Sequence, residues 1–487
     1  MAKGTNAKIL PKQPPINAVR CDPPLPGGEL ANFGTSIGAR PDRYQHTDLG
    51  NAERLIDRHG ADLRFCPQVR KWLHWDGERW LWDDDGDIVR RATDTIRAIY
   101  GEAQQVKDAD KRKALVGHAT RSEGRMRIDA MIKLAESLDG VPLPITRLDA
   151  DRGLLGIVGG VLDLRTGHFQ PAVREHHITK RANVSFDPNA ACPRWLKFLD
   201  EIFAGNADVI SFVQRIVGYS LTGETSEQCL FVLFGNGANG KSVFLRIIHA
   251  LLGDYAMQAV PDTFMEAHRG TSATNDLARL RGARLVSASE PDEDCILAEG
   301  VVKQLTGQNK VTCRFLYQEF FEYLPQFKIL LATNHKPEVK GGDYAIWRRL
   351  HLIPFEVTIP PERQDKTLAE KIIGDELPGV LTWALHGLAA WRDGGLVPPA
   401  AVVVATKAYR EDMDIIGDWI DQDCEVSPDL PFARTSKLFE SYKGFCEGQQ
   451  IRPLNARQFG RKLAERGFKA RKGTAGTRGF CGIDVRE

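Results

Sequence analysis

Apolar residues in the middle of the chain, from about residue 200 to residue 360, alternate between helical and extended spacing. The helical spacing predicts helices over residues 209–221 and 242–252. Short apolar runs predict buried strands over residues 229–234, 284–288 and 328–333. Strands that alternate with helices in this way are typical of an α/β domain with a largely parallel sheet.

The segments on either side of this region have different patterns. Before it, we predict helices over 52–58 and 93–106 and two β-hairpins. The first hairpin pairs 71–75 with 79–82 around Asp76 and Gly77, and the second pairs 160–164 with 168–170. After the α/β region, helical spacing predicts helices over 366–373, 377–391 and 402–421.

These patterns divide the chain into five segments. Residues 1–45 are rich in Pro, Gly and Asn and show no hydrophobic period, so we predict a disordered arm. We expect a mixed α+β domain over 46–200, the α/β core over 201–360, a helical linker or lid over 361–424, and a small basic module over 425–487.

The composition is that of an ordinary soluble globular protein, with 42% hydrophobic and 26% charged residues. Since the formal net charge is +1, any nucleic-acid surface must be a local patch. The 9 cysteines are scattered without zinc-type spacing, which favours reduced thiols in a cytoplasmic protein. We expect no membrane partner, because there is no signal-like segment and the best apolar run, 380–391, is too short to span a bilayer.

A phosphate-binding loop is the strongest chemical motif. Residues 235–242 match the pattern G-x-x-x-x-G-K-[ST] at every fixed position, between a predicted strand and a predicted helix. Glycines let backbone N–H groups curl around phosphate oxygens, and the helix N-terminus adds its positive dipole end. We therefore expect ATP with Mg²⁺, with Lys241 on the β- and γ-phosphates and the Ser242 hydroxyl on the metal. The predicted cofactor-binding residues are Gly235, Asn236, Gly237, Ala238, Asn239, Gly240, Lys241 and Ser242.

Polar residues after the P-loop are candidates for catalysis. Glu290 follows an apolar strand and is placed to hold Mg²⁺ or activate water, alone or with the acids at 292–294, unless it is a solvated acid. Asn334 follows the next strand and can position water, with a turn residue as the alternative. Arg348 or Arg349 can neutralise transition-state charge on a neighbouring subunit's ATP, or can be an ordinary basic dipeptide.

Together these residues resemble a superfamily 3 helicase of the AAA+ class. More narrowly, they resemble the helicase half of phage and plasmid primase-helicases, the group related to the poxvirus primase-helicase. The matching residues are 218–223, the P-loop, 275–280, 289–290, 303–307, Arg314, 333–337, 348–349 and 353–355. The segment 75–80 (WDGERW) is similar to the accessory domain that precedes this helicase, so the resemblance covers 50–487.

The resemblance implies a fold and a set of roles. The fold would be α/β, with an AAA+ P-loop NTPase core between a mixed α+β accessory domain and a C-terminal winged-helix-like module. Glu290 would be the Walker B acid, Asn334 would be sensor 1, and Arg349 or Arg348 would be the arginine finger. The family also implies a homo-oligomeric ring, usually a hexamer, with ATP sites at subunit interfaces and translocation along one DNA strand.

Two features depart from the family pattern. Many members have two adjacent acids at the Walker B position, whereas this chain has Ser289 and Glu290, so the identity of the catalytic base stays open. The larger members carry an N-terminal polymerase-like primase domain, whereas some 45 residues precede the accessory segment in this sequence. We therefore expect priming, where it is needed, from a separate primase or polymerase.

Superfamily 3 helicases insert a hairpin before sensor 1 into the ring channel, and residues 311–323 occupy that place. Lys303, Arg314, Phe315 and Tyr317 are candidates there for contact with the DNA backbone or with bases. A β-hairpin with ordinary core aromatics explains each individual residue equally well.

The C-terminal module is a second candidate for DNA binding. Asn455 and Gln458 predict a capping box that opens a helix over 456–465, and 468–471 and 478–485 predict a hairpin. This order resembles a winged helix, whose cations would lie on phosphates. The candidate residues are Arg457, Arg461, Lys462, Lys469 and Arg471, and the alternative is a solubilising basic face.

The sequence thus predicts an oligomeric, Mg²⁺-dependent ATPase that translocates on and unwinds single-stranded or forked DNA during phage or plasmid replication in a bacterial cytoplasm. A second hypothesis is an ATP-gated initiator that binds and melts an origin without processive unwinding. A third hypothesis is a small-molecule P-loop kinase, which the basic C-terminal module argues against.

Overall fold

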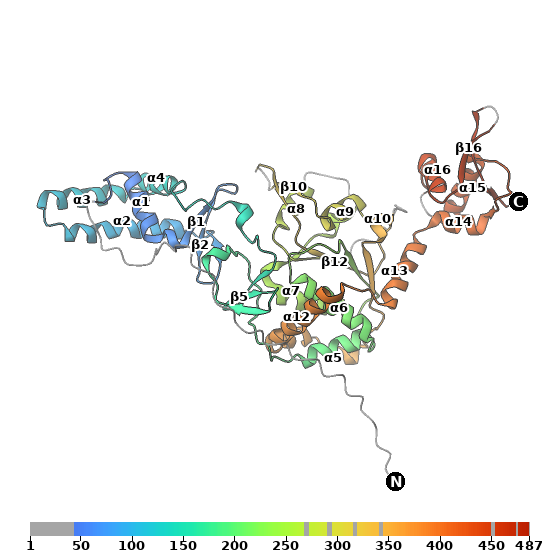
Figure 1. The fold of residues 1–487 in the computed structure, drawn as a ribbon, viewed down its shortest axis with the longest axis horizontal. Coiled ribbons are helices and arrows are strands. Elements are labelled where there is room, and N and C mark those ends of the chain that lie inside the picture. Colours follow the sequence, from blue (N-terminus) through green and yellow to red (C-terminus); the bar gives the residue numbers. More distant parts are fainter. Residues whose placement is uncertain are drawn as a thin grey trace, which may run out of the picture.

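The computed structural model shows an elongated molecule in which an N-terminal helical region and a C-terminal module lie on opposite sides of a central parallel sheet (Figure 1). The structure describes residues 43–266, 272–289, 295–314, 319–339, 344–449, 453–473 and 476–486. The predicted disordered arm therefore lies almost wholly outside the described residues.

The N-terminal region consists of four helices and a small antiparallel sheet. The helices are α1 (Asp48–His59), α2 (Asp87–Gln105), α3 (Ala109–Ser122) and α4 (Arg125–Ala135), and the strands are β1 (Leu63–Cys66), β2 (Lys71–Trp75) and β3 (Trp80–Trp82). Strands β2 and β3 pair as the first predicted hairpin. Side-chain oxygens accept hydrogen bonds from N–H groups in the first turns of helices α1, α2 and α3. These oxygens belong to Thr47, Asp83 and Asp108 respectively.

A second antiparallel sheet connects this region to the centre. Its strands are β4 (Leu154–Ile157), β5 (Gly160–Asp163) and β6 (His168–Gln170), and helices α5 (Pro193–Ile202) and α6 (Ala207–Ser220) follow. Strands β5 and β6 are the second predicted hairpin. Leu155 and Leu162 share one hydrophobic cluster with Phe198 and Phe244, so the core continues across the boundary predicted at residue 200.

Five parallel strands form the central sheet. They are β7 (Leu230–Phe234), β8 (Ala256–Gln258), β9 (Leu285–Ser289), β12 (Lys328–Thr333) and β13 (Leu350–Pro354), in the spatial order β13-β7-β12-β9-β8. The predicted parallel sheet is thus confirmed. Since successive side chains of a strand point to opposite faces, Phe231 and Leu233 join one hydrophobic cluster while Leu230 and Val232 join another.

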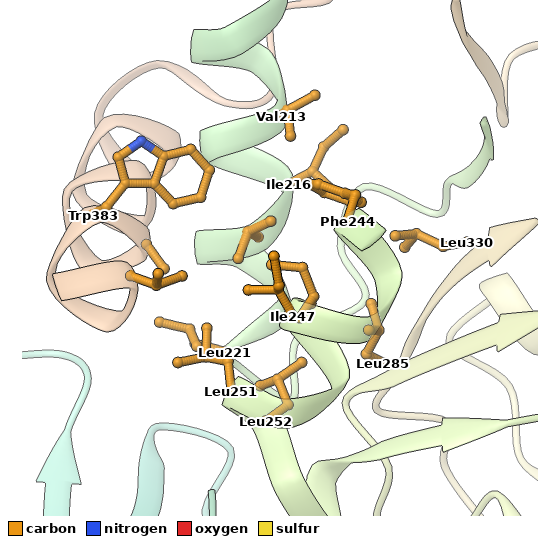
Figure 2. Close-up of a cluster of buried hydrophobic side chains, with 14 of the residues drawn as sticks. Val213, Ile216, Leu221, Phe244, Ile247, Leu251, Leu252, Leu285, Leu330 and Trp383 are labelled. Atoms are coloured by element: carbon orange, nitrogen blue, oxygen red, sulfur yellow. The ribbon is translucent and has the colours of Figure 1, made fainter. Parts of the chain in front are cut away.

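Helices cover both faces of this sheet, which is why its strands are continuous apolar runs in the sequence. On one face, Val213 and Ile216 of α6 lie beside Phe244 and Ile247 of α7 (Lys241–Leu252), as Figure 2 shows. Side chains of α8 (Ser272–Arg279), α9 (Glu299–Thr306) and α10 (Tyr344–Trp347) pack on the other face. Between α9 and β12, β10 (Val311–Cys313) and β11 (Phe321–Tyr323) form the antiparallel hairpin that the sequence predicted.

Helix α12 (Leu377–Gly394) packs closely on α6 after the short helix α11 (Leu368–Asp375). A Cβ on Gly218 of α6 would lie 2.2 Å from the Leu388 nitrogen, and a Cβ on Gly387 would lie 2.0 Å from the Gln214 oxygen. Both contacts are too short for any side chain, so glycine is required at both positions of this helix pair.

The single helix predicted over 402–421 is wrong. The structure has two helices there, α13 (Ala400–Asp412) and α14 (Ile415–Asp423). The Asp414 carboxylate accepts the Gly417 N–H at 3.2 Å and caps the start of α14. Asp is favoured at a helix start because its carboxylate satisfies a free N–H group, and here that local bond competes with continuation of α13.

The C-terminal module has its own hydrophobic core, which includes Trp419, Tyr442 and Phe459. Its elements are α14, β14 (Cys424–Val426), β15 (Ala433–Arg434), α15 (Thr435–Gly448), α16 (Ala456–Glu465), β16 (Lys469–Lys472), β17 (Arg478–Cys481) and β18 (Ile483–Val485). The core therefore takes in α14, which precedes the boundary predicted at residue 425.

Strands of this module form two small sheets, β15-β17-β16 and β14-β18. The predicted capping box at Asn455 and Gln458 is confirmed, with both reciprocal hydrogen bonds. The single strand predicted over 478–485 is wrong, because the chain changes sheets at Gly482, where φ is 85°. A positive φ there is easy for glycine and breaks an extended strand.

Candidate nucleotide site

The loop between β7 and α7 has the backbone shape of an anion cradle. It follows the carboxyl end of β7 and leads into the N-terminus of α7. Backbone φ is positive at Ala238 (59°) and Gly240 (86°). It is not positive at the residue that precedes each of them, Gly237 and Asn239 respectively. Such alternation turns successive N–H groups toward one side, where they can bind an anion.

Two glycines of the loop are required by close contacts. A Cβ on Gly235 would lie 2.1 Å from the backbone oxygen of Phe355, and a Cβ on Gly240 would lie 2.6 Å from the side chain of Ile202. These are the two fixed glycines of the sequence motif. Gly237, at a variable position, would meet no atom within 4 Å.

The end of β13 holds the loop in place, which the sequence did not predict. The buried Asn239 amide donates to the Phe355 oxygen at 3.2 Å, and the Ile359 N–H donates to the Ala238 oxygen at 2.8 Å. The sequence predicted Asn239 as a cofactor-binding residue. Its side chain is hydrogen-bonded to the backbone after β13 and so holds the loop in its conformation. The only signal in the sequence was the apolar run that ends at Phe355.

Lys241 and Asn334 come together at the carboxyl edge of the sheet. Strands β7 and β12 are neighbours, with Thr333 paired to Phe234, so Asn334 follows directly beside the P-loop. The Lys241 ammonium donates to the Asn334 side-chain oxygen at 3.0 Å and also to the Gly235 backbone oxygen. Ser242, in the first turn of α7, is exposed, so its hydroxyl can reach a ligand.

The predicted acid, Glu290, lies outside the described residues. The strand that leads to it ends at Ser289, which pairs with Ala332 of the neighbouring β12. The carboxyl end of β9 is therefore two strands away from the P-loop strand and next to the strand that carries Asn334.

Arg348 and Arg349 lie at the opposite edge of the sheet from the P-loop of the same chain. They precede Leu350, which pairs with Leu230 at the start of β7, and the P-loop begins five residues further along the chain, at Gly235, about 17 Å away. The buried Arg349 donates to the Ala345 oxygen at 2.5 Å and to Gln228 at 3.0 Å. Arg348 is exposed and also donates to Gln228, at 2.9 Å.

Two buried cations, Arg284 and Lys328, lie at the amino ends of β9 and β12, and the sequence did not predict a role for them. The Arg284 guanidinium donates to the backbone oxygens of Leu154 and Leu221, and so joins the sheet of β4–β6 to the central region. The Lys328 ammonium donates to the Thr222 oxygen at 2.6 Å. Burial lowers the pKa of the Arg284 guanidinium and holds the pKa of Lys328 well below its ordinary value.

The hairpin candidates for DNA contact are only partly described. Lys303 forms an ion pair with Glu299 at 3.3 Å on α9. Arg314 is exposed, and its guanidinium carbon lies 4.6 Å from the centre of the Phe320 ring. Phe315 and Tyr317 lie outside the described residues.

In the C-terminal module, four of the five predicted DNA-binding cations are exposed, namely Arg457, Arg461, Lys469 and Arg471. Lys462 differs from them. It is half-buried and lines a cavity of about 260 Å³ together with Glu338 and Trp347 of the central region, and burial lowers its pKa. Its side chain therefore lies where the C-terminal module meets the central region.

Within the described ranges, no group of three or more His, Cys, Asp or Glu side chains lies close enough to hold a metal. The described cysteines are free thiols. No helix in the described part of the chain is long and apolar enough to cross a membrane.

A parallel α/β sheet with a P-loop at its carboxyl edge defines the central region as an NTPase-like core. An apo structure of the NrS-1 C-terminal region is similar in fold: it superposes with a TM-score of 0.52 at 8% sequence identity, covering 90% of this chain and 100% of that one. At this identity the likeness concerns the fold alone.

Two parts of the chain match known family models, and several known proteins are similar to it. Residues 52–204 match the family "D5 N terminal like", and residues 233–349 match a family of unknown function, DUF5906. The chain is 26% identical over 409 residues to the "Putative helicase L207/L206" of Acanthamoeba polyphaga mimivirus, which covers 76% of this chain. It is 27% identical over 238 residues to the "Putative helicase 022R" of Frog virus 3, and this match covers 45% of this chain. It is 23% identical over 278 residues to a protein of African swine fever virus named as a "Putative primase", and this match covers 54% of this chain.

The family match over residues 52–204 and the relatives named as helicases and as a primase support the predicted resemblance to the D5-like primase-helicase family. The matched regions span 42%, 24% and 28% of the lengths of these three relatives. Two of these relatives are named as helicases and one as a primase.

Proposed function

We propose that this chain is an ATP-driven, Mg²⁺-dependent DNA helicase motor of the AAA+ class that acts in phage or plasmid replication. The observation that carries the proposal is the meeting of Gly235, Lys241 and Asn334 at the carboxyl edge of the parallel sheet. The relatives named as helicases add support at low identity.

A triphosphate with Mg²⁺ fits the residues of this edge. The two glycine positions leave room for phosphate oxygens, and the Lys241 ammonium would exchange its Gly235 and Asn334 partners for the β- and γ-phosphates. The Ser242 hydroxyl is the kind of hard oxygen ligand that Mg²⁺ prefers. When bound, the metal neutralises charge on the phosphates. Glu290 would activate water as the Walker B acid, and the Asn334 amide would orient it as sensor 1.

The position of the arginines supports an oligomeric ring. A guanidinium that stabilises phosphoryl transfer must lie near the γ-phosphate. Since Arg348 and Arg349 lie at the other edge of their own sheet, they would act on the ATP of a neighbouring subunit. Arg348 is the better finger because its side chain is exposed, whereas Arg349 is buried within its own subunit. The ring would be a homo-oligomer, most simply a hexamer.

The C-terminal module supports contact with DNA. The succession of α14, β15, α15, α16, β16 and β17, with β17 between β15 and β16, supports the proposal of a winged helix. Arg457 and Arg461 on the exposed side of α16 and Lys469 and Arg471 on β16 would contact phosphates.

Strand separation tests the proposal directly. The purified chain should displace a labelled strand from forked DNA in the presence of ATP and Mg²⁺, and Lys241→Ala should abolish both displacement and ATP turnover while far-UV circular dichroism stays unchanged. Electron microscopy with a non-hydrolysable ATP analogue and forked DNA should show closed rings. ATP-dependent binding and local melting without displacement of long strands would instead favour the initiator, and turnover in the Lys241→Ala variant would remove the P-loop from the mechanism.

A further inference from the structure

A large cavity lies between the N-terminal region and the central sheet, away from the P-loop. Its volume is about 680 Å³, which is within the range of sites for small organic ligands. Arg281 and Gly282 line it just before β9, and Leu324 and Gln326 line it just before β12. The cavity therefore adjoins the amino edge of the parallel sheet, whereas the P-loop lies at the carboxyl edge.

The cavity has an excess of positive charge. At its rim, Lys71 pairs with Asp84 at 2.6 Å and Lys310 pairs with Glu322 at 3.1 Å, so these four charges compensate one another. Four further cations line it, namely Arg152, Lys180, Arg279 and Arg281. Asp149 is the only other acidic residue of the lining, and its carboxylate accepts hydrogen bonds from Thr179.

None of these four cations has a carboxylate partner within the described part of the chain. The Lys180 ammonium donates to the Asp254 backbone oxygen at 3.2 Å, and the Arg281 guanidinium donates to the Ile145 backbone oxygen. Arg152 and Arg279 have neither a hydrogen bond nor an ion pair from their guanidinium groups to any described residue. Burial lowers the pKa of Lys180 and of Arg281, although the nearby Asp149 carboxylate opposes this shift at both cations.

Aromatic and apolar side chains complete the wall. The half-buried Trp82 comes from β3 and the buried Tyr323 from β11, so the cavity joins the first hairpin to the hairpin before β12. Aromatic rings beside cations are what a base and its phosphate require, because bases stack on aromatic faces and guanidinium groups bind phosphate oxygens.

We propose that this cavity is a second nucleotide site, distinct from the P-loop, which binds one nucleotide unit through its phosphate and its base. The same chemistry is offered by a free nucleotide and by a nucleotide within a single DNA strand. Arg152 and Arg279 bind the phosphate, since both are free to do so, and Trp82 contacts the base.

Binding measurements with two probes test this proposal. The full chain carries Lys241→Ala to silence the P-loop, and the probes are fluorescein-labelled oligothymidylate and free thymidine monophosphate. Adding Arg152→Gln with Arg279→Gln should weaken binding of the occupant about 10-fold or more, since hydrogen bonds to charged groups are strong. If the occupant is a strand, the slope of log affinity against log salt should also fall by about 1.4, as two phosphate contacts are lost. Arg125→Gln, at an exposed arginine of α4 outside the cavity, is the matched control and should change neither value.

Loss of oligothymidylate affinity assigns the site to a DNA strand, and loss of monophosphate affinity assigns it to a free nucleotide. Unchanged affinity for both probes in the folded double variant overturns the proposal. If that variant does not fold, photocrosslinking of iodouracil probes to the unsubstituted pocket decides the question. Adducts at Trp82 or Tyr323 support the site, and adducts confined to other parts of the chain overturn it.

Discussion

A single added methyl group should have different effects at two glycines of the P-loop, Gly235 and Gly237. In Gly235→Ala, the added Cβ would lie 2.1 Å from the Phe355 backbone oxygen, while in Gly237→Ala it would meet no atom within 4 Å. Neither glycine has a positive φ, so the two substitutions differ in contacts and not in backbone strain. They form a matched pair within one loop.

The size of the effect follows from the geometry. Relief of the Gly235 contact to an ordinary separation requires the loop and the end of β13 to move apart by roughly 1 Å. Such overpacking typically costs about 1–3 kcal/mol, and a displacement of this size at a reacting centre typically lowers the rate about 100-fold. The same displacement would also weaken the hydrogen bond from Asn239 to Phe355.

Nucleotide affinity and turnover measure the effect. Fluorescence titration with a labelled ATP analogue and steady-state ATP hydrolysis should show a large loss for Gly235→Ala and values near those of the unsubstituted chain for Gly237→Ala. Equal activity of the Gly235→Ala variant, or equal damage in both variants, would refute the view that the Phe355 contact holds the loop in its active shape.

Three further predictions follow from the structure. Arg348→Ala should lower ATP turnover about 1,000-fold with unchanged nucleotide affinity. If Arg348 acts on the ATP of a neighbouring subunit, mixing this variant with the Lys241→Ala variant should restore turnover. Burial lowers the pKa of His351 to about 4. Because the unfolded chain binds that proton near pH 6.5, the unfolding free energy from urea titrations should fall between pH 6.5 and 4, and less so in His351→Phe. Arg457→Ala with Arg461→Ala should reduce the salt slope of duplex DNA binding by about 1.8, whereas Lys462→Ala should leave it unchanged.

Local sequence patterns predicted most of the helices and strands. The strands β7, β9 and β12 appear in the sequence as apolar runs because both of their faces are buried, and the capping box of α16 appears because its two hydrogen bonds lie within four residues. The break between α13 and α14 was missed, since helical spacing continues through it and a single cap at Asp414 decides it. The same holds for Gly482, where one positive φ moves the chain from one sheet to another.

The candidate nucleotide site could be proposed from the sequence for a similar reason. The P-loop is a contiguous segment whose glycine spacing is imposed by its own backbone, so Lys241 and Ser242 could be assigned from the motif. Asn334 could be proposed because parallel strands that share an edge end together. The role of Asn239 could not be proposed, because its partner lies 116 positions away in the sequence.

The sequence by itself determined the order of elements, the parallel sheet and the phosphate loop, because each depends on residues that are near one another along the chain. Only the tertiary structure decided which distant groups meet: Arg349 becomes buried while Arg348 stays exposed, and Lys462 lines a cavity with residues of the central region while Arg457 and Arg461 stay exposed. It also brought Arg152, Lys180, Arg279 and Arg281 to one cavity. These outcomes depend on how elements that are distant in the sequence pack together. Hydrophobic periodicity is a local property of the sequence, so it does not predict which remote side chains become buried or meet.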